Sequence, residues 1–221
     1  MATISSNKNL KQRKKIFSVV AASAILFTAC NNSGTKNEQD GHDMNNMSKD
    51  TAQHAATAAD KDVRAVATTY TDVDAKAAAS VKEIVGHYLH IKNALADDNG
   101  SEAANGGKAM ESAISKLDKS LLTAQQKTDY DKIEDDLKEH AQHIGKNSDK
   151  IEHQRSHFSM MSEDVYDLVK AFGAGQPMYH DHCPMYSEKK GAMWLSEMKE
   201  VKNPYLGTQM PGCGTVEEVI K

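Results

Sequence analysis

The sequence predicts an all-α protein, an antiparallel up-down four-helix bundle followed by a mostly irregular C-terminal segment that packs on it. Apolar residues recur at helical spacing in four consecutive segments between residues 73 and 172, and short polar joints separate these segments. Aromatic residues make up only 5% of the chain, whereas Ala, Lys, Asp and Glu are abundant. This composition favours helices over a sheet sandwich.

Each of the four segments carries one continuous apolar stripe. The first segment covers about residues 73–97 and the second about 101–121. The third begins at Thr123, with Gln126 three residues later as in a capping box, and the fourth starts near Ser148. Short joints make neighbouring helices antiparallel, so the four stripes form one core. The stripe residues, in chain order, are Val81, Ile84, Val85, Tyr88 and Leu95; Met110, Ile114, Leu117 and Leu121; Tyr130, Ile133, Leu137 and Ile144; and Ile151, Phe158, Val165, Leu168, Val169 and Phe172.

Residues 1–29 predict a secretory signal peptide. Five basic and no acidic side chains precede an uncharged, largely apolar run of 14 residues, shorter than the ~20 that cross a bilayer as a helix. The run ends in Leu26-Phe27-Thr28-Ala29-Cys30, which resembles the lipobox of bacterial lipoproteins, although Phe27 stands where Leu is usual. The resemblance implies a lipid on Cys30 that anchors the chain to a membrane. Asn31 implies the outer membrane, with the protein facing the periplasm. An ordinary signal peptide with an incidental cysteine is the alternative.

Cleavage before Cys30 leaves 192 residues, 22 of them basic and 31 acidic, with a net charge of −9 when histidine is neutral. Such a chain does not attract phosphate backbones, so we do not expect nucleic acid as a partner. Residues 30–72 contain few large apolar side chains and predict a flexible tether. Residues 73–176 then form the helical bundle, and residues 177–221 form a C-terminal segment of the same domain.

The C-terminal segment is rich in Cys, Met, Pro and Gly, and it holds the main candidate site. Thiolate and thioether sulfurs are soft ligands that suit Cu(I) and, less selectively, zinc or another soft metal, and imidazole completes such a shell. The candidate ligands are Cys183, Met185, Met210, Cys213, His180 and His182. The alternative is a structural Cys183–Cys213 disulfide, because two cysteines in an oxidising compartment commonly pair. The methionines would then pack as core residues.

Two further groups are secondary metal candidates. The tether residues His42, Met44 and Met47 resemble the methionine motifs that capture Cu(I), the alternative being a polar linker with chance methionines. On the helices, pairs of histidines three or four residues apart share a face: His87 and His90, His140 and His143, and His153 and His157.

Among the helical histidines, the best arrangement places His143 opposite His153 or His157, because the short turn near Asn147 brings the third and fourth helices together. His140 lies at the edge of the third stripe, which predicts a partly buried, hydrogen-bonded side chain. A structural or surface role is the alternative for each pair. Arg155 is expected to anchor the C-terminal segment or an acidic residue on a neighbouring helix.

Several motifs together resemble a domain-of-unknown-function family. They are Gln154-Arg155, Tyr179, Cys183-Pro184-Met185, Asn203-Pro204-Tyr205 and Cys213-Gly214, within a likeness of roughly residues 75–221. The family occurs in envelope lipoproteins of Gram-negative bacteria and fused to periplasmic adaptor subunits of heavy-metal efflux pumps. The resemblance therefore implies a link to resistance against copper or related metals, with an efflux adaptor as a possible partner. It supplies no established catalytic residues.

The sequence shows no motif for a nucleophile and its base, no phosphate-binding loop, no Cys-x-x-Cys and no Glu-x-x-His. We therefore do not expect an enzyme. The predicted function is an envelope lipoprotein that binds Cu(I) or a similar soft metal. The alternative is a helical interaction module that docks on an efflux adaptor or another envelope partner, with a Cys183–Cys213 disulfide and no metal.

Overall fold

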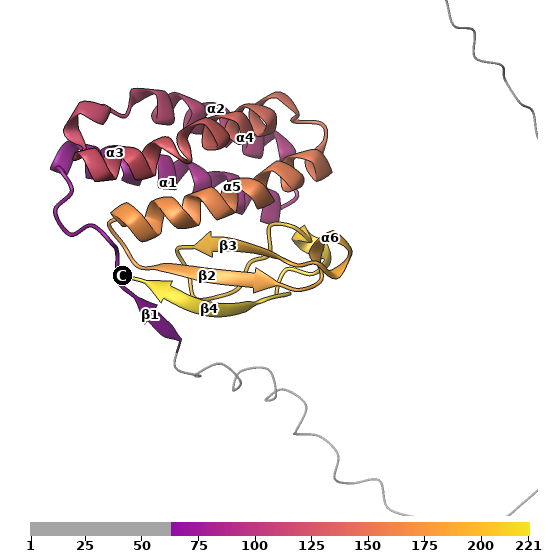
Figure 1. Cartoon of the computed structure of the whole chain (residues 1–221). Helices are drawn as coiled ribbons and strands as arrows, with labels where there is room; N and C mark the ends of the chain where they lie inside the picture. Colours follow the sequence, from indigo (N-terminus) through magenta and orange to yellow (C-terminus); the bar gives the residue numbers. More distant parts are fainter. Residues whose placement is uncertain (1–62) are drawn as a thin grey trace, which may run out of the picture. The chain divides into compact units, whose positions relative to one another are not determined.

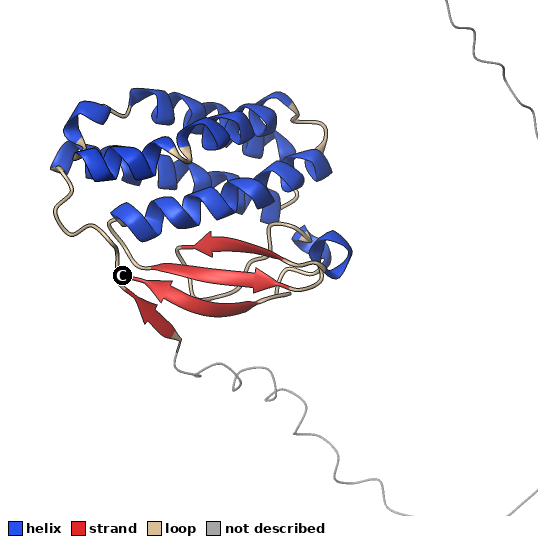
Figure 2. Ribbon diagram, in the orientation of Figure 1, coloured by secondary structure: helices blue, strands red, loops and turns tan. Residues whose placement is uncertain are grey.

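The computed structural model describes residues 63–221, which form a mixed α/β fold rather than an all-α one (Figures 1 and 2). A layer of helices covers one face of a four-stranded sheet. The predicted helices are present, but the predicted irregular C-terminal segment is wrong, because most of the sheet lies there. The signal peptide, Cys30 and the tether candidates His42, Met44 and Met47 fall outside the described residues. The predicted tether extends to residue 72, and its described end is wrong as a flexible segment, because Arg64–Val66 form a strand of the sheet and Tyr70 packs against the core.

Four helices make up most of the helical layer: α1 (Ala75–Ala96), α2 (Gly100–Lys116), α4 (Glu134–Lys146) and α5 (Ile151–Phe172). Each packs against the next in this order, and α5 returns to pack against α1. The predicted stripes meet in one core. All of their residues are buried except Leu121 and Ile151, which are half-buried and pack against that core.

The predicted third helix is divided in two. The capping box of Thr123 and Gln126 is confirmed at the start of α3 (Ala124–Asp131). A turn at Lys132 and Ile133 then separates α3 from α4. The second helix ends at Lys116, and a short 3-10 helix, η1 (Lys119–Leu121), follows it. Two helices, α3 and α4, therefore replace the one long helix that was expected after Thr123.

Two glycines bring α2 and α4 into backbone contact. A Cβ atom placed on Gly107 would lie 2.7 Å from the carbonyl oxygen of Ala141 and 2.8 Å from the amide nitrogen of Gly145. No side chain larger than hydrogen fits between the two helices at this crossing without moving them. The contact fixes the last turns of α4, which carry one of the candidate metal ligands.

The sheet consists of β1 (Arg64–Val66), β2 (Met178–Cys183), β3 (Ala192–Ser196) and β4 (Thr215–Ile220), in the order β1-β4-β2-β3. Strand β1 pairs with β4 in parallel, and the other pairs are antiparallel. Strand β4 is rich in β-branched residues, which pack well on a half-buried pleated surface. Trp194, Leu195 and Ile220 belong to the same core as the helices. Two short elements lie in the connections, α6 (Tyr186–Lys189) and η2 (Gly207–Gln209).

Arg155 on α5 ties the C-terminal segment to the helices. Arg155 is buried, with 5% of its surface exposed. Its guanidinium donates hydrogen bonds to the carbonyl oxygens of Pro204 (2.9 Å) and Leu95 (3.0 Å). It also forms an ion pair with Asp98, in the turn between α1 and α2. The predicted anchoring role of Arg155 is therefore confirmed. Among the described helices, none has the length and apolar character needed to cross a membrane.

Candidate metal centre

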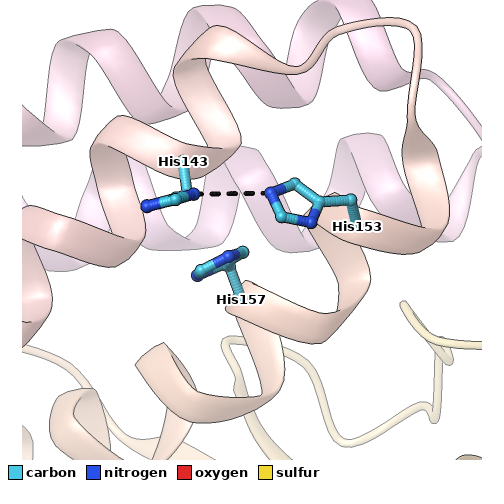
Figure 3. Close-up of side chains that lie close together, drawn as sticks. All are labelled: His143, His153 and His157. Atoms are coloured by element: carbon cyan, nitrogen blue, oxygen red, sulfur yellow. Dashed lines mark hydrogen bonds between the residues drawn. The ribbon is translucent and has the colours of Figure 1, made fainter. Parts of the chain in front are cut away.

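Three imidazole rings meet at the surface between α4 and α5 (Figure 3). His143 lies in the last turn of α4, whereas His153 and His157 lie one turn apart at the start of α5. One ring nitrogen of each histidine lies within 4.8 Å of those of the other two, and all three side chains are half-buried. Within residues 63–221, no other three His, Cys, Asp or Glu side chains bring their ligand atoms so close together.

The short connection between the helices explains why these rings meet. Residues 147–150 reverse the chain, and the side-chain amide of Asn147 donates a 2.8 Å hydrogen bond to the carbonyl oxygen of His143. Helix α5 then runs back along α4 and presents His153 and His157 on one face, four residues apart. The predicted placement of His143 opposite His153 or His157 is therefore confirmed, although its role in metal binding stays a prediction.

The three rings are close but are not yet arranged around a common point. Nδ1 of His143 lies 3.4 Å from Nε2 of His153 (Figure 3). The rings of His143 and His157 stack, with centroids 4.1 Å apart and planes 14° apart. Imidazole lone pairs lie in the ring plane, so the lone pairs of two stacked rings lie in nearly parallel planes and do not meet at one point. One ring must therefore rotate before both can bind the same ion.

A fourth imidazole extends the cluster. Nδ1 of His140 lies 3.1 Å from Nδ1 of His157, so one of these nitrogens donates its proton and the other accepts it. His140 is half-buried, as its position at the edge of the third stripe predicts. The contact occupies one nitrogen of His157 and leaves Nε2 of that ring free for another partner.

Two of the rings, those of His157 and His140, are neutral at pH 7. Burial, reinforced by the neighbouring His143, His153 and His140, lowers the pKa of His157 to about 4. Burial also lowers the pKa of His140 below its ordinary value. A neutral imidazole keeps a lone pair available for a metal ion, whereas a protonated one must first lose its proton.

The six candidate ligands of the C-terminal segment fall into different surroundings. The Sγ atoms of Cys183 and Cys213 lie 3.2 Å apart, at the end of β2 and in the loop before β4. The side chains of Met185 and Met210 are exposed, at 48% and 47%. The structure therefore brings the two thiols into contact and leaves both thioethers at the surface.

The two histidines of the same segment lie on either side of Glu217. Nδ1 of His180 and Nδ1 of His182 each lie 3.6 Å from one oxygen of that carboxylate. A bulge between His180 and Asp181 leaves Glu217 without a partner in the β2–β4 ladder and turns it toward both rings. The sequence did not point to Glu217, because it stands beside a second glutamate, Glu218, and only the bulge distinguishes the two.

Comparison with known proteins identifies the helical part of the chain. A family model described as "Protein of unknown function (DUF3347)" matches residues 84–177, so the chain contains a DUF3347 domain there. The domain runs from the middle of α1 to the residue before β2 and includes the cluster of His143, His153 and His157. Searches of curated proteins and of solved structures give no match to this chain.

Proposed function

We propose that the protein binds a copper ion, or a similar metal, through His143, His153 and His157. The observation that supports this function is the approach of three ring nitrogens to within 4.8 Å on two adjoining helices. Imidazole suits Cu, Zn and Ni, whereas Mg²⁺ and Ca²⁺ prefer oxygen ligands. Among divalent first-row ions, Cu²⁺ binds such sites most strongly, which makes copper the first choice.

The cluster would hold the ion by a small rearrangement. The His157 ring would rotate out of its stack with His143, so that one nitrogen of each ring can face the same ion. His140 pairs with Nδ1 of His157 and fixes which nitrogen faces the ion, as outer-shell partners of metal-bound histidines commonly do. Because the ligands come from α4 and α5, binding would link the two helices.

The cellular setting of this function comes from the sequence. The lipobox-like segment at Cys30 supports an envelope lipoprotein, most consistent with the outer membrane and the periplasm. The family resemblance supports a link to metal resistance, with a heavy-metal efflux adaptor as a partner that receives the ion. A soft Cu(I) site at Cys183, Met185, Met210 and Cys213 is a second candidate, favoured by the contact between the two thiols. The competing function is a metal-free interaction module that docks on such an adaptor.

Titration of the full chain with Cu²⁺ and with Zn²⁺ tests the histidine site. We expect one tightly bound ion per chain, and we expect His143→Ala, His153→Ala or His157→Ala each to weaken binding at least tenfold. His90→Ala is the matched control, because His90 is an exposed helical histidine that pairs with Glu102 at 3.2 Å. The electron paramagnetic resonance spectrum of the Cu²⁺ form should show hyperfine splitting from several nitrogens.

Three outcomes would overturn the proposal. Equal affinity in the three site variants and in His90→Ala would mean that metal binds elsewhere or only adventitiously. Absence of binding by the wild-type chain would favour the interaction module. Loss of affinity in Cys183→Ser, with the histidine variants unchanged, would move the site to the sulfur residues.

A further inference from the structure

The thiols of Cys183 and Cys213 are close enough to form a bond after a small side-chain movement. Both cysteines are free in the structure, and their Sγ atoms lie 3.2 Å apart. A disulfide needs a separation of about 2.05 Å. A shift of roughly 1 Å, within the reach of a rotation about the Cα–Cβ bonds, closes that difference.

The backbone around both residues holds them in place independently of the sulfur contact. Cys183 is the last residue of β2, and its neighbour His182 pairs with Thr215 on β4. The carbonyl oxygen of Cys213 accepts a 2.6 Å hydrogen bond from the side-chain amide of Asn203, which is completely buried. The amide of Cys213 donates to the carbonyl oxygen of Met210 at 3.2 Å. The two Cα positions are therefore fixed by the sheet and by the loop.

The two thiols differ in their access to solvent. Cys183 is 0% exposed and belongs to the hydrophobic core, whereas Cys213 is half-buried and only packs against it. The residue before Cys213 is an exposed glycine, so a small reagent can approach that side. A reagent from solvent therefore reaches Cys213 and cannot reach Cys183 in the folded chain.

We propose that Cys183 and Cys213 form an intramolecular disulfide by an ordered exchange in which Cys213 reacts first with a small disulfide oxidant. The thiolate of Cys213 attacks one sulfur of the oxidant, forms a mixed disulfide and releases one thiol. Cys183 then gives up its proton and attacks Sγ of Cys213, which forms the protein disulfide and releases the second thiol. Two protein thiols thus lose two electrons and two protons, and one oxidant disulfide becomes two thiols.

The surroundings of the pair set its reactivity. The hydrogen bond with Cys183, together with burial, raises the pKa of Cys213 above its ordinary value. The attacking thiolate is consequently scarce at neutral pH, and the first step should accelerate as the pH rises. Such a pair suits a disulfide that is formed once and kept, rather than a catalyst of repeated thiol exchange.

Glutathione disulfide added to the reduced, folded full chain tests the order of reaction. Every protein in the comparison carries Cys30→Ser, so that Cys183 and Cys213 are its two thiols. We expect the protein with both thiols to lose two hydrogen atoms by intact mass spectrometry without accumulating an adduct. Cys183→Ser should retain one glutathione on Cys213, whereas Cys213→Ser should keep its thiol free until denaturant is added.

Two results would overturn this inference. If the protein with both thiols keeps both or accumulates the mixed disulfide, the pair does not close. Adduct formation at similar rates in Cys183→Ser and Cys213→Ser would show that Cys183 is equally accessible. Cys183→Ala provides a second variant in case a serine hydroxyl disturbs the buried position. Histidine-site binding is measured separately and is expected to be the same in oxidised and reduced chains.

Discussion

Asp181 in strand β2 is completely buried, and neither of its carboxylate oxygens has a hydrogen-bond partner within the described part of the chain. Opposite it on β3 lies Trp194, whose indole N–H is likewise buried without a partner. Burial raises the pKa of Asp181 to about 8, although the charge of Lys92 acts in the opposite direction. The carboxyl group is therefore protonated in the folded protein at neutral pH.

The raised pKa predicts that stability falls as the pH increases. In the unfolded chain the carboxyl titrates near 3.8, so the folded state holds one more proton between about pH 4 and pH 8. The associated stability is fully present below that window and is lost as the pH rises through about 8. Asp181→Asn keeps the shape without the ionisable group and should stabilise the protein at pH 8 by about 1–3 kcal/mol.

Urea unfolding at pH 5, 7 and 9 measures this effect. The wild-type chain should lose more stability over this range than Asp181→Asn does. Because other groups also titrate, the difference between the two proteins is the quantity to compare. Parallel curves for both would show that Asp181 does not cause the pH dependence.

The sequence predicted the histidine cluster better than it predicted the buried polar residues of the sheet, such as Asp181. The pairing of His143 with His153 and His157 follows from helical spacing and one short turn, which are local features. Asp181 escaped notice because a run of His, Asp and His reads as solvent-exposed. Its burial depends on which face of β2 lies under the helices, and that is decided by distant parts of the chain.

At the element scale, the contact between α2 and α4 has a direct test in two glycine substitutions. Gly107→Ala places a methyl group against the backbone atoms of Ala141 and Gly145, at 2.7 and 2.8 Å. Separating the helices to make room should cost about 1–3 kcal/mol. Gly86 lies inside α1 with no atom within 4 Å of its added Cβ. Gly86→Ala should therefore stabilise the protein by about 0.5–1 kcal/mol.

Unfolding by urea or heat gives both values on the same scale. Opposite signs for the two substitutions are expected, because helix propensity favours alanine at both sites and only Gly107 has a backbone in the way. A stabilising effect at Gly107 would mean that α2 and α4 do not approach as closely as described. The prediction requires no metal and is independent of the proposed function.

The sequence predicted the helices far better than the strands. A helix of about 20 residues repeats its apolar pattern over several turns, and that signal is local. The strands contain three to six residues, and a bulge in the β2–β4 ladder breaks the alternation that would reveal them. Strand β1 pairs with a segment 154 residues away, Arg64 with Glu218. No window along the sequence contains both partners, so an irregular segment was the natural expectation.

At the scale of the whole molecule, the predicted lipid anchor can be separated from the fold. Residue 30 lies outside residues 63–221, which contain the described core. Cys30→Ala should therefore move the protein from the membrane fraction to the soluble fraction without changing its helical circular dichroism. Cell fractionation with and without detergent measures the first effect. Retention of the variant in the membrane fraction would contradict the lipoprotein proposal.

The order of strands in the sheet also has a consequence for how the molecule is made. Strand β4 lies between β1 and β2, yet it follows every other element of the described fold along the chain. As the polypeptide emerges vectorially, from a ribosome or through a translocation channel, β1 has no partner until residues 215–220 appear. During that interval only the β2–β3 hairpin can form, and the edge of β2 that later accepts β4 stays open. An emerging chain halted before residue 215 would thus present two unpaired strand edges to a chaperone, although its helices were already complete.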